Sequence, residues 1–211
     1  LITGASRGIG YETARVLGEA GSNVIAHYGG HREGAMDATA GIPEERKMII
    51  QADLATPGAA AALWNEAVAW RGRVDVVVNN AAIMPEVGIE DAEADWEDAL
   101  AAAFAINVMA PAVLIRLATQ HFIANGGGVL ITMSSWAVHR GSDNPKLAAY
   151  AASKAALAAV TKTMARAHAR DGVLGYCIAP GTVRTDMSVR SACNQGGEDA
   201  VTASLTMGEW V

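Results

Sequence analysis

The sequence predicts an α/β protein in three layers, with one doubly wound parallel sheet covered by helices on both faces. Short β-branched apolar runs alternate with longer Ala-rich segments along the chain, and this alternation is typical of a parallel sheet. The run VDVVVN at Val74–Asn79 is apolar on both sides of the pleat, as in a central strand that is buried on both faces.

The individual elements follow in order from these patterns. The β-branched runs are each bounded by turn-forming residues, and they predict strands up to Thr3 and at Asn23–His27, Met48–Gln51, Val74–Asn79, Val129–Thr132 and Leu174–Ala179. The Ala-rich runs predict helices at Ile9–Glu19, Glu33–Ala40, Gly58–Trp70, Asp95–Phe122 and Tyr150–Ala169. No internal repeat, low-complexity tract or linker interrupts the series, so residues 1–211 are expected to form a single domain.

Composition excludes several classes of protein. The 211 residues are 51% hydrophobic and 18% charged, which excludes a disordered chain. The net charge of −6 argues against a nucleic-acid partner, because nucleic-acid-binding proteins need a clustered basic surface. No stretch of about 18 apolar residues runs without charge or punctuation, so no membrane-spanning helix is expected.

Two further expectations concern the compartment and the chain ends. Cys177 and Cys193 cannot form a disulfide framework, so a reducing, cytoplasmic location is expected. Leu1 already belongs to a predicted strand, and the last residues look helical without a stop signal. Both native termini are therefore expected to extend beyond this sequence.

A glycine-rich turn, Thr3–Gly10, joins the first strand to the first helix. Gly4 permits a tight turn, Gly8 lets backbone N–H groups approach a phosphate, and Gly10 lets the helix sit close to the sheet. The spacing G-x-x-x-G-x-G differs from the usual dinucleotide fingerprint, and a purely structural turn is the alternative. The strand before it and the helix after it favour phosphate binding.

The second strand ends without the carboxylate that binds the ribose 2′-hydroxyl in NAD-specific folds. The chain has His27-Tyr28-Gly29-Gly30-His31-Arg32 at this point. Arg7 and Arg32 could pair with a 2′-phosphate, and Ser6 could add a hydroxyl. NADP is therefore expected, with NAD less favoured; the alternative is that Arg32 only caps a helix.

Two further strand ends carry polar side chains that suit a nucleotide. Asp53 could accept a hydrogen bond from an exocyclic amine such as that of adenine, or it could cap the next turn. The sequence Asn79-Asn80-Ala81-Ala82 could let a flat ring approach, or it could form an ordinary turn.

Tyr150 and Lys154 have the spacing that brings a phenol and an ammonium to one face of a helix. A cation at about 4–5 Å is expected to lower the pKa of the tyrosine toward neutral pH. A tyrosine tuned in this way can give or take a proton. A surface Tyr–Lys pair is the alternative.

Two more features accompany this pair. Ser134 and Ser135 end a strand, where a hydroxyl can hydrogen-bond a substrate oxygen or serve the turn alone. Asn107 lies inside a helix, and Pro111 lacks the N–H that would bond the Asn107 carbonyl. The sequence thus predicts a kink, either with a free carbonyl that can hold a water or fitted only to packing.

Together these residues resemble the short-chain dehydrogenases/reductases, in the branch of short, single-domain members. The pattern is similar to 3-oxoacyl-carrier-protein reductase-like and glucose dehydrogenase-like members. The matching motifs come in family order and cover nearly all of the chain: TGASRGIG at Thr3–Gly10, DL at Asp53-Leu54, NNAA at Asn79–Ala82, Asn107, the Ser of MSS, YAASK at Tyr150–Lys154 and PGTVRTDM at Pro180–Met187. The resemblance implies a Rossmann-like fold and a single dinucleotide-binding and catalytic domain.

The resemblance also implies roles for particular residues. Tyr150 would be the general acid/base, and Lys154 would lower its pKa and hold the nicotinamide ribose. Ser135 would orient the substrate oxygen, and Asn107 would hold a water that links Lys154 to solvent. Asp53 would meet adenine. The residues expected to bind the cofactor are Gly4, Ser6, Arg7, Ile9, Gly10, Tyr28, Arg32, Asp53, Leu54, Asn80, Ala81, Tyr150, Lys154, Pro180, Gly181, Val183 and Thr185. No metal site is expected.

The chain departs from the family pattern near the substrate pocket. Ser135 and Tyr150 are two residues further apart than in many members, and Val138 stands where a Gly is usual. The pocket is therefore expected to be reshaped, with Trp136, His139 and Arg140 as candidate lining residues. Residues 187–211 are expected to form a mobile substrate lid.

The family also implies an assembly. The helices at Asp95–Phe122 and Tyr150–Ala169 would form the faces of a homodimer, commonly doubled into a homotetramer. The family's C-terminal strand is absent from this sequence, which would leave an edge of the sheet exposed.

The leading functional hypothesis is an NADP-dependent oxidoreductase that transfers hydride between the cofactor and a small carbonyl or secondary alcohol. A non-catalytic NADP-binding sensor is the alternative, but such relatives usually lose the tyrosine or lysine that this chain has. A sugar-nucleotide epimerase or dehydratase is disfavoured by the glycine spacing. Neither the substrate nor the physiological direction follows from the sequence.

Overall fold

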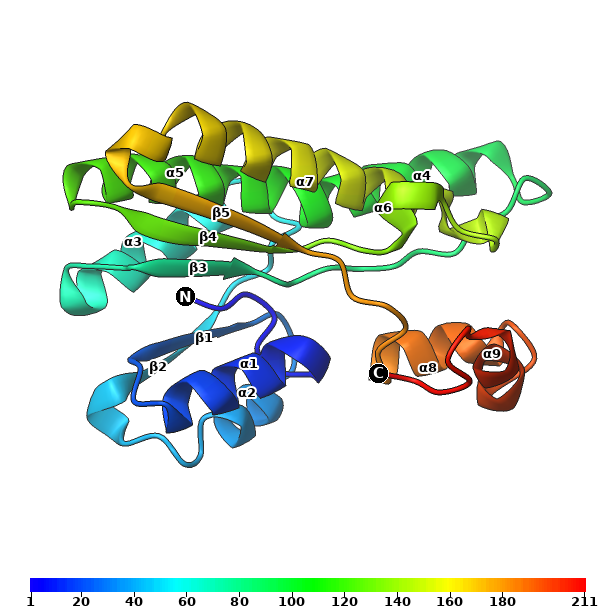
Figure 1. The fold of residues 1–211 in the computed structure, drawn as a ribbon, viewed down its shortest axis with the longest axis horizontal. Helices are drawn as coiled ribbons and strands as arrows, with labels where there is room; N and C mark the ends of the chain where they lie inside the picture. Colours follow the sequence, from blue (N-terminus) through cyan, green and yellow to red (C-terminus); the bar gives the residue numbers. More distant parts are fainter.

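The computed structural model describes residues 1–211, and its strands and helices alternate as the sequence predicts (Figure 1). Five parallel strands form two groups, β1–β2 and β3–β4–β5. Their bounds are β1 (Val24–Tyr28), β2 (Lys47–Gln51), β3 (Val76–Asn79), β4 (Gly128–Met133) and β5 (Val173–Ile178).

The N-terminal residues join the two groups into one sheet. Ile2 bridges in parallel to Ala26 of β1 and to Val78 of β3. The Thr3 N–H donates to the Val78 carbonyl at 3.0 Å. The strand order is therefore β2, β1, the N-terminal segment, β3, β4, β5, which confirms the predicted doubly wound sheet. The order reverses between the N-terminal segment and β3, where such sheets bind ligands at their carboxyl edge.

The helices cover the sheet unequally (Figure 1). Helices α3, α5 and α7 lie on one face, and α1 and α2 lie below β1 and β2 on the other. The α-helices are α1 (Gly8–Glu19), α2 (Arg32–Ala38), α3 (Ala59–Arg71), α4 (Glu93–Phe104), α5 (Ala110–Ala124), α6 (Ala137–Arg140), α7 (Ala148–Ala167), α8 (Asp186–Cys193) and α9 (Glu198–Ser204). Short 3-10 turns occur at η1 (Glu44–Arg46), η3 (Pro145–Leu147) and η4 (Ala169–Asp171).

The long helix that the sequence predicts at Asp95–Phe122 is divided in the structure. A π-helical segment, η2 (Ala105–Met109), separates α4 from α5, and Pro111 lies in the first turn of α5. By length and composition alone, the stretch Glu93–Ala124 could cross a membrane. In this fold its Leu114 and Phe122 are fully buried in the core that α3, α5 and the sheet enclose.

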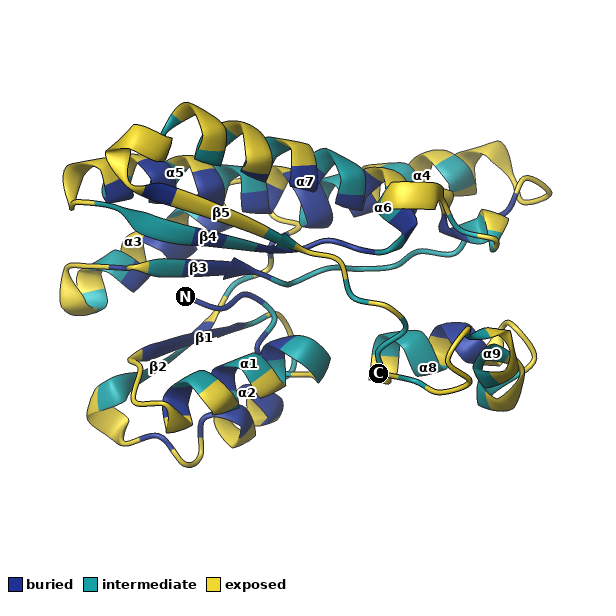
Figure 2. Cartoon of the chain, viewed as in Figure 1, coloured by how far each residue is buried: buried dark blue, intermediate teal, exposed yellow.

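One face of the edge strand β5 has no helix against it (Figure 2). Leu174, Tyr176 and Ile178 are each about half exposed, at 50%, 54% and 47%. Gly175 faces the other way, because a Cβ there would meet Ala165 and Thr161 of α7. β5 also pairs only with β4, so the predicted exposed edge is present in addition to this apolar face.

Residues 187–211 contain more regular structure than the predicted loop. Helices α8 and α9 fill most of this segment, and Gly196 and Gly197, both with positive φ, form the turn between them. Thr185 caps α8 through reciprocal hydrogen bonds with Ser188, which explains why a helix begins there. The expectation that the chain ends within a helix is met only as far as Ser204, where α9 ends, and was wrong for residues 205–211.

Candidate active site

The carboxyl ends of the strands open into a cavity of about 1010 Å³. Its wall is built by the glycine-rich turn, by the residues after β2, β3, β4 and β5, and by α8 and α9. A cavity of this size at the carboxyl edge of a doubly wound sheet is the expected position of a ligand site.

The glycine-rich turn has the geometry of an anion site. Gly4 and Gly8 adopt positive φ angles of 66° and 52°, which favour glycine. Helix α1 begins at Gly8 with no side-chain cap and no acidic residue in its first turn, so its N-terminal N–H groups suit a phosphate. A Cβ at Gly10 would collide with the Gly4 carbonyl and the Asn80 amide, which confirms the predicted close packing. These features fit a dinucleotide.

Two side chains hold this turn against the sheet. The Asn80 amide donates to the carbonyls of Thr3 at 2.9 Å and Gly4 at 3.1 Å. The buried His27 accepts from the Gly4 N–H through Nδ1, so its Nε2 carries the proton and donates to the Ala52 carbonyl at 3.0 Å. Burial lowers the pKa of His27, which favours this neutral form. The sequence placed His27 only at a strand end and gave no sign of this contact.

Most predicted cofactor residues line the cavity. These are Gly4, Ser6, Arg7, Ile9, Asp53, Leu54, Asn80, Ala81, Tyr150, Lys154, Pro180, Gly181, Val183 and Thr185. Gly10 lies behind the turn. Asp53 also accepts hydrogen bonds from the Ala55 N–H and the Thr56 hydroxyl, so it caps the next turn, as the alternative interpretation expects.

Two predicted cofactor residues, Tyr28 and Arg32, do not line the cavity. Arg32 is the first residue of α2, and its side chain runs along that helix to hydrogen-bond the Met36 sulfur at 3.1 Å. Arg7 does line the cavity, where its guanidinium lies 3.8 Å from the Asp186 carboxylate. In this structure, therefore, Arg7 is the one of the two predicted arginines that is placed to meet a phosphate.

Ser135, Tyr150 and Lys154 meet at the other end of the cavity. Ser135 follows β4, and Tyr150 and Lys154 lie in the first turns of α7. The Tyr150 and Ser135 side chains both line the cavity, close enough for the Ser135 hydroxyl to lower the pKa of Tyr150 in part. Lys154 is buried, with its Nζ 5.7 Å from the centre of the Tyr150 ring and donating to the Met133 carbonyl at 2.8 Å. The predicted side-by-side placement of phenol and ammonium is present.

The expected lowering of the Tyr150 pKa is not found in this structure. Burial raises the pKa of Tyr150 above its ordinary value, and the nearby Ser135 side chain only partly opposes this. Burial also lowers the pKa of Lys154 to about 8. The physical reason is that both charged forms lose hydration in the interior. Tyr150 is thus protonated at neutral pH and has a proton to give.

Asn107 lies in the π-helical segment η2 and is 1% exposed. Its amide donates to the Ile83 carbonyl at 2.8 Å and to the Ser153 hydroxyl at 3.0 Å, and its Oδ1 accepts from the Ile83 N–H at 2.9 Å. The predicted break near Pro111 is present, as a π segment and not as a simple kink. Asn107 does not line the cavity; it connects the chain after β3 to α7.

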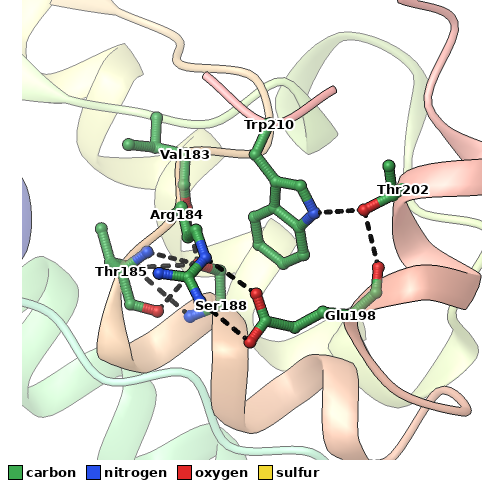
Figure 3. A network of polar contacts seen from close by, with 7 residues as sticks. All are labelled: Val183, Arg184, Thr185, Ser188, Glu198, Thr202 and Trp210. Atoms are coloured by element: carbon green, nitrogen blue, oxygen red, sulfur yellow. Dashed lines mark hydrogen bonds and ion pairs between the residues drawn. The ribbon is translucent and has the colours of Figure 1, made fainter. Parts of the chain in front are cut away.

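A polar network connects the C-terminal segment, which contains α8 and α9, to the loop after β5 (Figure 3). The Arg184 guanidinium forms two hydrogen bonds to the Glu198 carboxylate, at 2.8 and 3.2 Å. The Trp210 indole donates to the Thr202 hydroxyl at 2.7 Å, and Trp210 itself lines the cavity. Sequence reasoning missed this network, because the interacting residues are 8 and 14 positions apart and their pairing depends on the fold.

The motif order, the parallel sheet and the cavity agree with the family that the sequence resembles. Residues 1–195 match the family model described as short chain dehydrogenase. The chain belongs to this family. It is accordingly an NAD(P)-dependent oxidoreductase with a Rossmann-like fold.

This short-chain dehydrogenase is similar in sequence to a reductase and to a steroid dehydrogenase. It is 34% identical over 191 residues to 3-oxoacyl-[acyl-carrier-protein] reductase of Staphylococcus aureus, covering 89% of this chain and 75% of the relative. It is 32% identical over 212 residues to 3β-hydroxysteroid dehydrogenase 1 of Eggerthella lenta, covering 99% and 79%.

Solved structures of a reductase and a dehydrogenase have a similar fold. The promiscuous reductase LugOII, which catalyses keto-reduction at C1 during lugdunomycin biosynthesis, superposes with a TM-score of 0.83 at 28% identity, covering 99% of this chain and 83% of that one. A 7α-hydroxysteroid dehydrogenase in complex with NADH and 7-oxo glycochenodeoxycholic acid superposes with a TM-score of 0.79 at 29% identity, covering 90% and 72%.

Proposed function

We propose that this short-chain dehydrogenase reduces a small-molecule carbonyl with NADPH, or oxidises the corresponding secondary alcohol, with Tyr150 as the general acid/base. The observation that carries the proposal is the convergence of Ser135, Tyr150 and Lys154 in the cavity that also contains the glycine-rich turn. The nicotinamide cofactor, when bound, supplies the hydride.

The residues of the chain supply the proton and the orientation. In reduction, Tyr150 gives its hydroxyl proton to the carbonyl oxygen, and Ser135 donates a hydrogen bond to the same oxygen as charge develops on it. The buried Lys154 ammonium then stabilises the tyrosinate that remains. Asn107 acts at a distance, because its bonds to Ile83 and Ser153 fix the start of α7.

A Tyr150→Phe variant tests the assignment of the general acid. We expect kcat to fall roughly a hundred- to ten-thousand-fold, because the proton donor is removed while the ring stays. Binding of NADPH, followed by fluorescence titration, should persist. Unchanged turnover would refute the role of Tyr150; absence of turnover in the unmodified protein with intact cofactor binding would favour the sensor alternative.

The preference for NADP over NAD is part of the proposal. It is supported by Arg7 in the cavity wall and by residues 29–32 directly after β1, which contain no carboxylate to repel a 2′-phosphate. We expect NADPH to bind more tightly than NADH, and Arg7→Ala to reduce the difference. Tighter binding of NADH would reverse this part of the proposal.

We further propose a cytoplasmic protein that assembles as a homodimer or homotetramer. The two cysteines are unpaired, which suits a reducing compartment. Met109 and Ile123, in the stretch from η2 to α5, are exposed apolar residues at 62% and 42%, which suits burial in a subunit interface. Light scattering of the purified protein tests the assembly, and a monomer at micromolar concentration would contradict it.

A further inference from the structure

We propose that Arg140 determines substrate specificity, by binding an oxyanion group, a carboxylate or a phosphate, on the carbonyl substrate. This inference rests on the proposed reductase function and names its substrate class. It depends on the position of Arg140 in the cavity and on the absence of any protein partner for its guanidinium.

The Arg140 side chain is held in the cavity wall by an aromatic ring. Trp136 and Arg140 both line the cavity, and the guanidinium carbon lies 5.4 Å from the centre of the Trp136 ring. A guanidinium over the face of an indole is attracted by the ring and loses freedom to move. This contact leaves the N–H groups at the edge of the guanidinium plane free to bind another group.

No acidic side chain of the protein neutralises Arg140. The ion pairs of the chain do not include it, and its guanidinium donates no hydrogen bond to any other residue. Asp143, three residues further on, also lines the cavity but does not come within 4.0 Å. Arg7 differs, because it is near Asp186. An arginine without a partner offers the planar set of donors that binds carboxylate or phosphate with two hydrogen bonds.

A second cation lines the same cavity from the C-terminal segment. Arg190 of α8 donates to the Asp186 carbonyl and, like Arg140, is in no ion pair with a carboxylate. Both arginines therefore face the cavity in a protein whose net charge is −6. The charged residues of the cavity lining are four cations, Arg7, Arg140, Lys154 and Arg190, and three carboxylates, Asp53, Asp143 and Asp186. The cations are in slight excess, and an excess of positive charge attracts anionic ligands.

The position of Arg140 suits the substrate rather than the cofactor phosphates. Arg140 is in α6, which packs against α7, whereas the glycine-rich turn leads into α1 on the other side of the sheet (Figure 1). Ser135 follows β4, and Arg140 ends the short helix α6 five residues later; both residues line the same cavity. One ligand can thus place its carbonyl at Ser135 and Tyr150 and its oxyanion at Arg140.

Three matched ketones test this inference: 4-acetylbenzoate, 4-acetylphenyl phosphate and the neutral 4-acetylbenzamide. The dissociation constant of each from the protein–NADP⁺ complex is measured by quenching of tryptophan fluorescence, and KM by NADPH oxidation. We expect at least one anion to bind about tenfold more tightly than the amide, because charge-assisted hydrogen bonds are stronger than neutral ones. The difference between carboxylate and phosphate identifies the preferred group, and rising ionic strength should reduce the preference.

Variants connect the preference to Arg140. In Arg140→Ala, the dissociation constants of the amide and the anion should become nearly equal. Arg140→Lys should keep part of the preference for the anion, because lysine retains the charge without the planar guanidinium. Arg166→Ala, an exposed arginine of α7 outside the cavity, should keep the full ratio. Thermal melting verifies that each variant is folded. If Arg140→Ala does not fold, Arg140→Lys still tests the inference.

Equal affinity for the three ketones, or a preference that survives Arg140→Ala, would overturn the inference. Failure of the proposed function gives a different result, in which the unmodified protein binds the anion and NADPH but reduces none of the ketones. The binding measurement therefore decides the role of Arg140 independently of turnover.

Discussion

At the scale of single residues, the proposed chemistry depends on how burial changes the pKa values of Tyr150 and Lys154. Burial raises the pKa of Tyr150 and lowers that of Lys154 to about 8, so both carry their protons at pH 7. A protonated Tyr150 is ready for reduction, whereas oxidation requires it to lose that proton first. The two directions of the reaction should therefore respond to pH in opposite ways.

For reduction, we expect kcat/KM to be level between about pH 6 and pH 8 and to fall above pH 8. Above that pH Lys154 loses the charge that stabilises the tyrosinate, and kcat/KM reports the free enzyme. For oxidation, kcat/KM should rise with pH. Initial rates in both directions across pH 6–10 measure this. A reduction rate that rises through pH 8 would contradict it, and Lys154→Met should remove the decline near pH 8.

At the scale of elements, Asn107 connects three segments that are distant in sequence. Asn107→Ala would remove this partner from the buried Ser153 hydroxyl and from the partly buried N–H and carbonyl of Ile83. Each buried group left unsatisfied costs about 1–3 kcal/mol, so we expect the free energy of unfolding to fall by about 2–4 kcal/mol. Urea denaturation measures this.

A matched variant shows whether the loss of stability comes from the Asn107 network or from removing any asparagine amide. Asn125→Ala removes an exposed asparagine whose amide bonds the His121 carbonyl within the same helical turn. This variant should change the free energy of unfolding by no more than about 0.5 kcal/mol. If the two variants lost equal stability, the connection that we assign to Asn107 would be wrong.

The segment with α8 and α9, which the sequence predicts to be a substrate lid, is the second element whose behaviour can be tested. Glu198→Ala removes both hydrogen bonds from Arg184 and frees α9 from the loop that contains Val183 (Figure 3). Arg184 and Glu198 are 64% and 36% exposed, so the loss of stability should stay below about 1 kcal/mol. We expect KM for the substrate to rise several-fold with a smaller change in kcat. Glu209→Ala, an exposed residue outside this network, should leave KM unchanged.

The sequence predicts the strands and most helices because their periodicity is local. It also predicts the convergence of Ser135, Tyr150 and Lys154, since strand ends and a helix start meet at one edge of the sheet. It does not predict the pKa of Tyr150, because burial depends on neighbours that only the fold brings together. Helices α8 and α9 were missed for a similar reason: α8 depends on reciprocal hydrogen bonds between Thr185 and Ser188 in a polar segment.

At the scale of the whole molecule, the N-terminal segment is the central strand, and the ligand cavity depends on it. Its Thr3 hydroxyl accepts from the Asn80 and Ala81 N–H groups, while His27 of β1 bonds Gly4. The two halves of the sheet therefore share one set of contacts beside the glycine-rich turn. Loosening this segment should affect global stability and cofactor binding together.

This coupling predicts a pH dependence of stability. The folded state holds His27 neutral, with its pKa below the ordinary value of 6.5, whereas the unfolded chain titrates near that value. The unfolded state therefore binds more protons below about pH 6.5, and stability falls as the pH drops through this range. The loss from one such group is at most about 1.4 kcal/mol per pH unit. Above about pH 6.5 this contribution is fully present.

Urea denaturation at pH 7.5 and pH 5.5 measures the effect, and His27→Gln isolates it. Glutamine can still donate and accept hydrogen bonds, but it does not titrate, so the variant should lose less stability between the two pH values than the unmodified protein. The NADPH affinity of the unmodified protein should fall over the same interval, because a protonated His27 cannot accept from the Gly4 N–H. If the variant kept the whole pH dependence, other groups would be responsible, and His27 would not link the glycine-rich turn to the stability of the sheet.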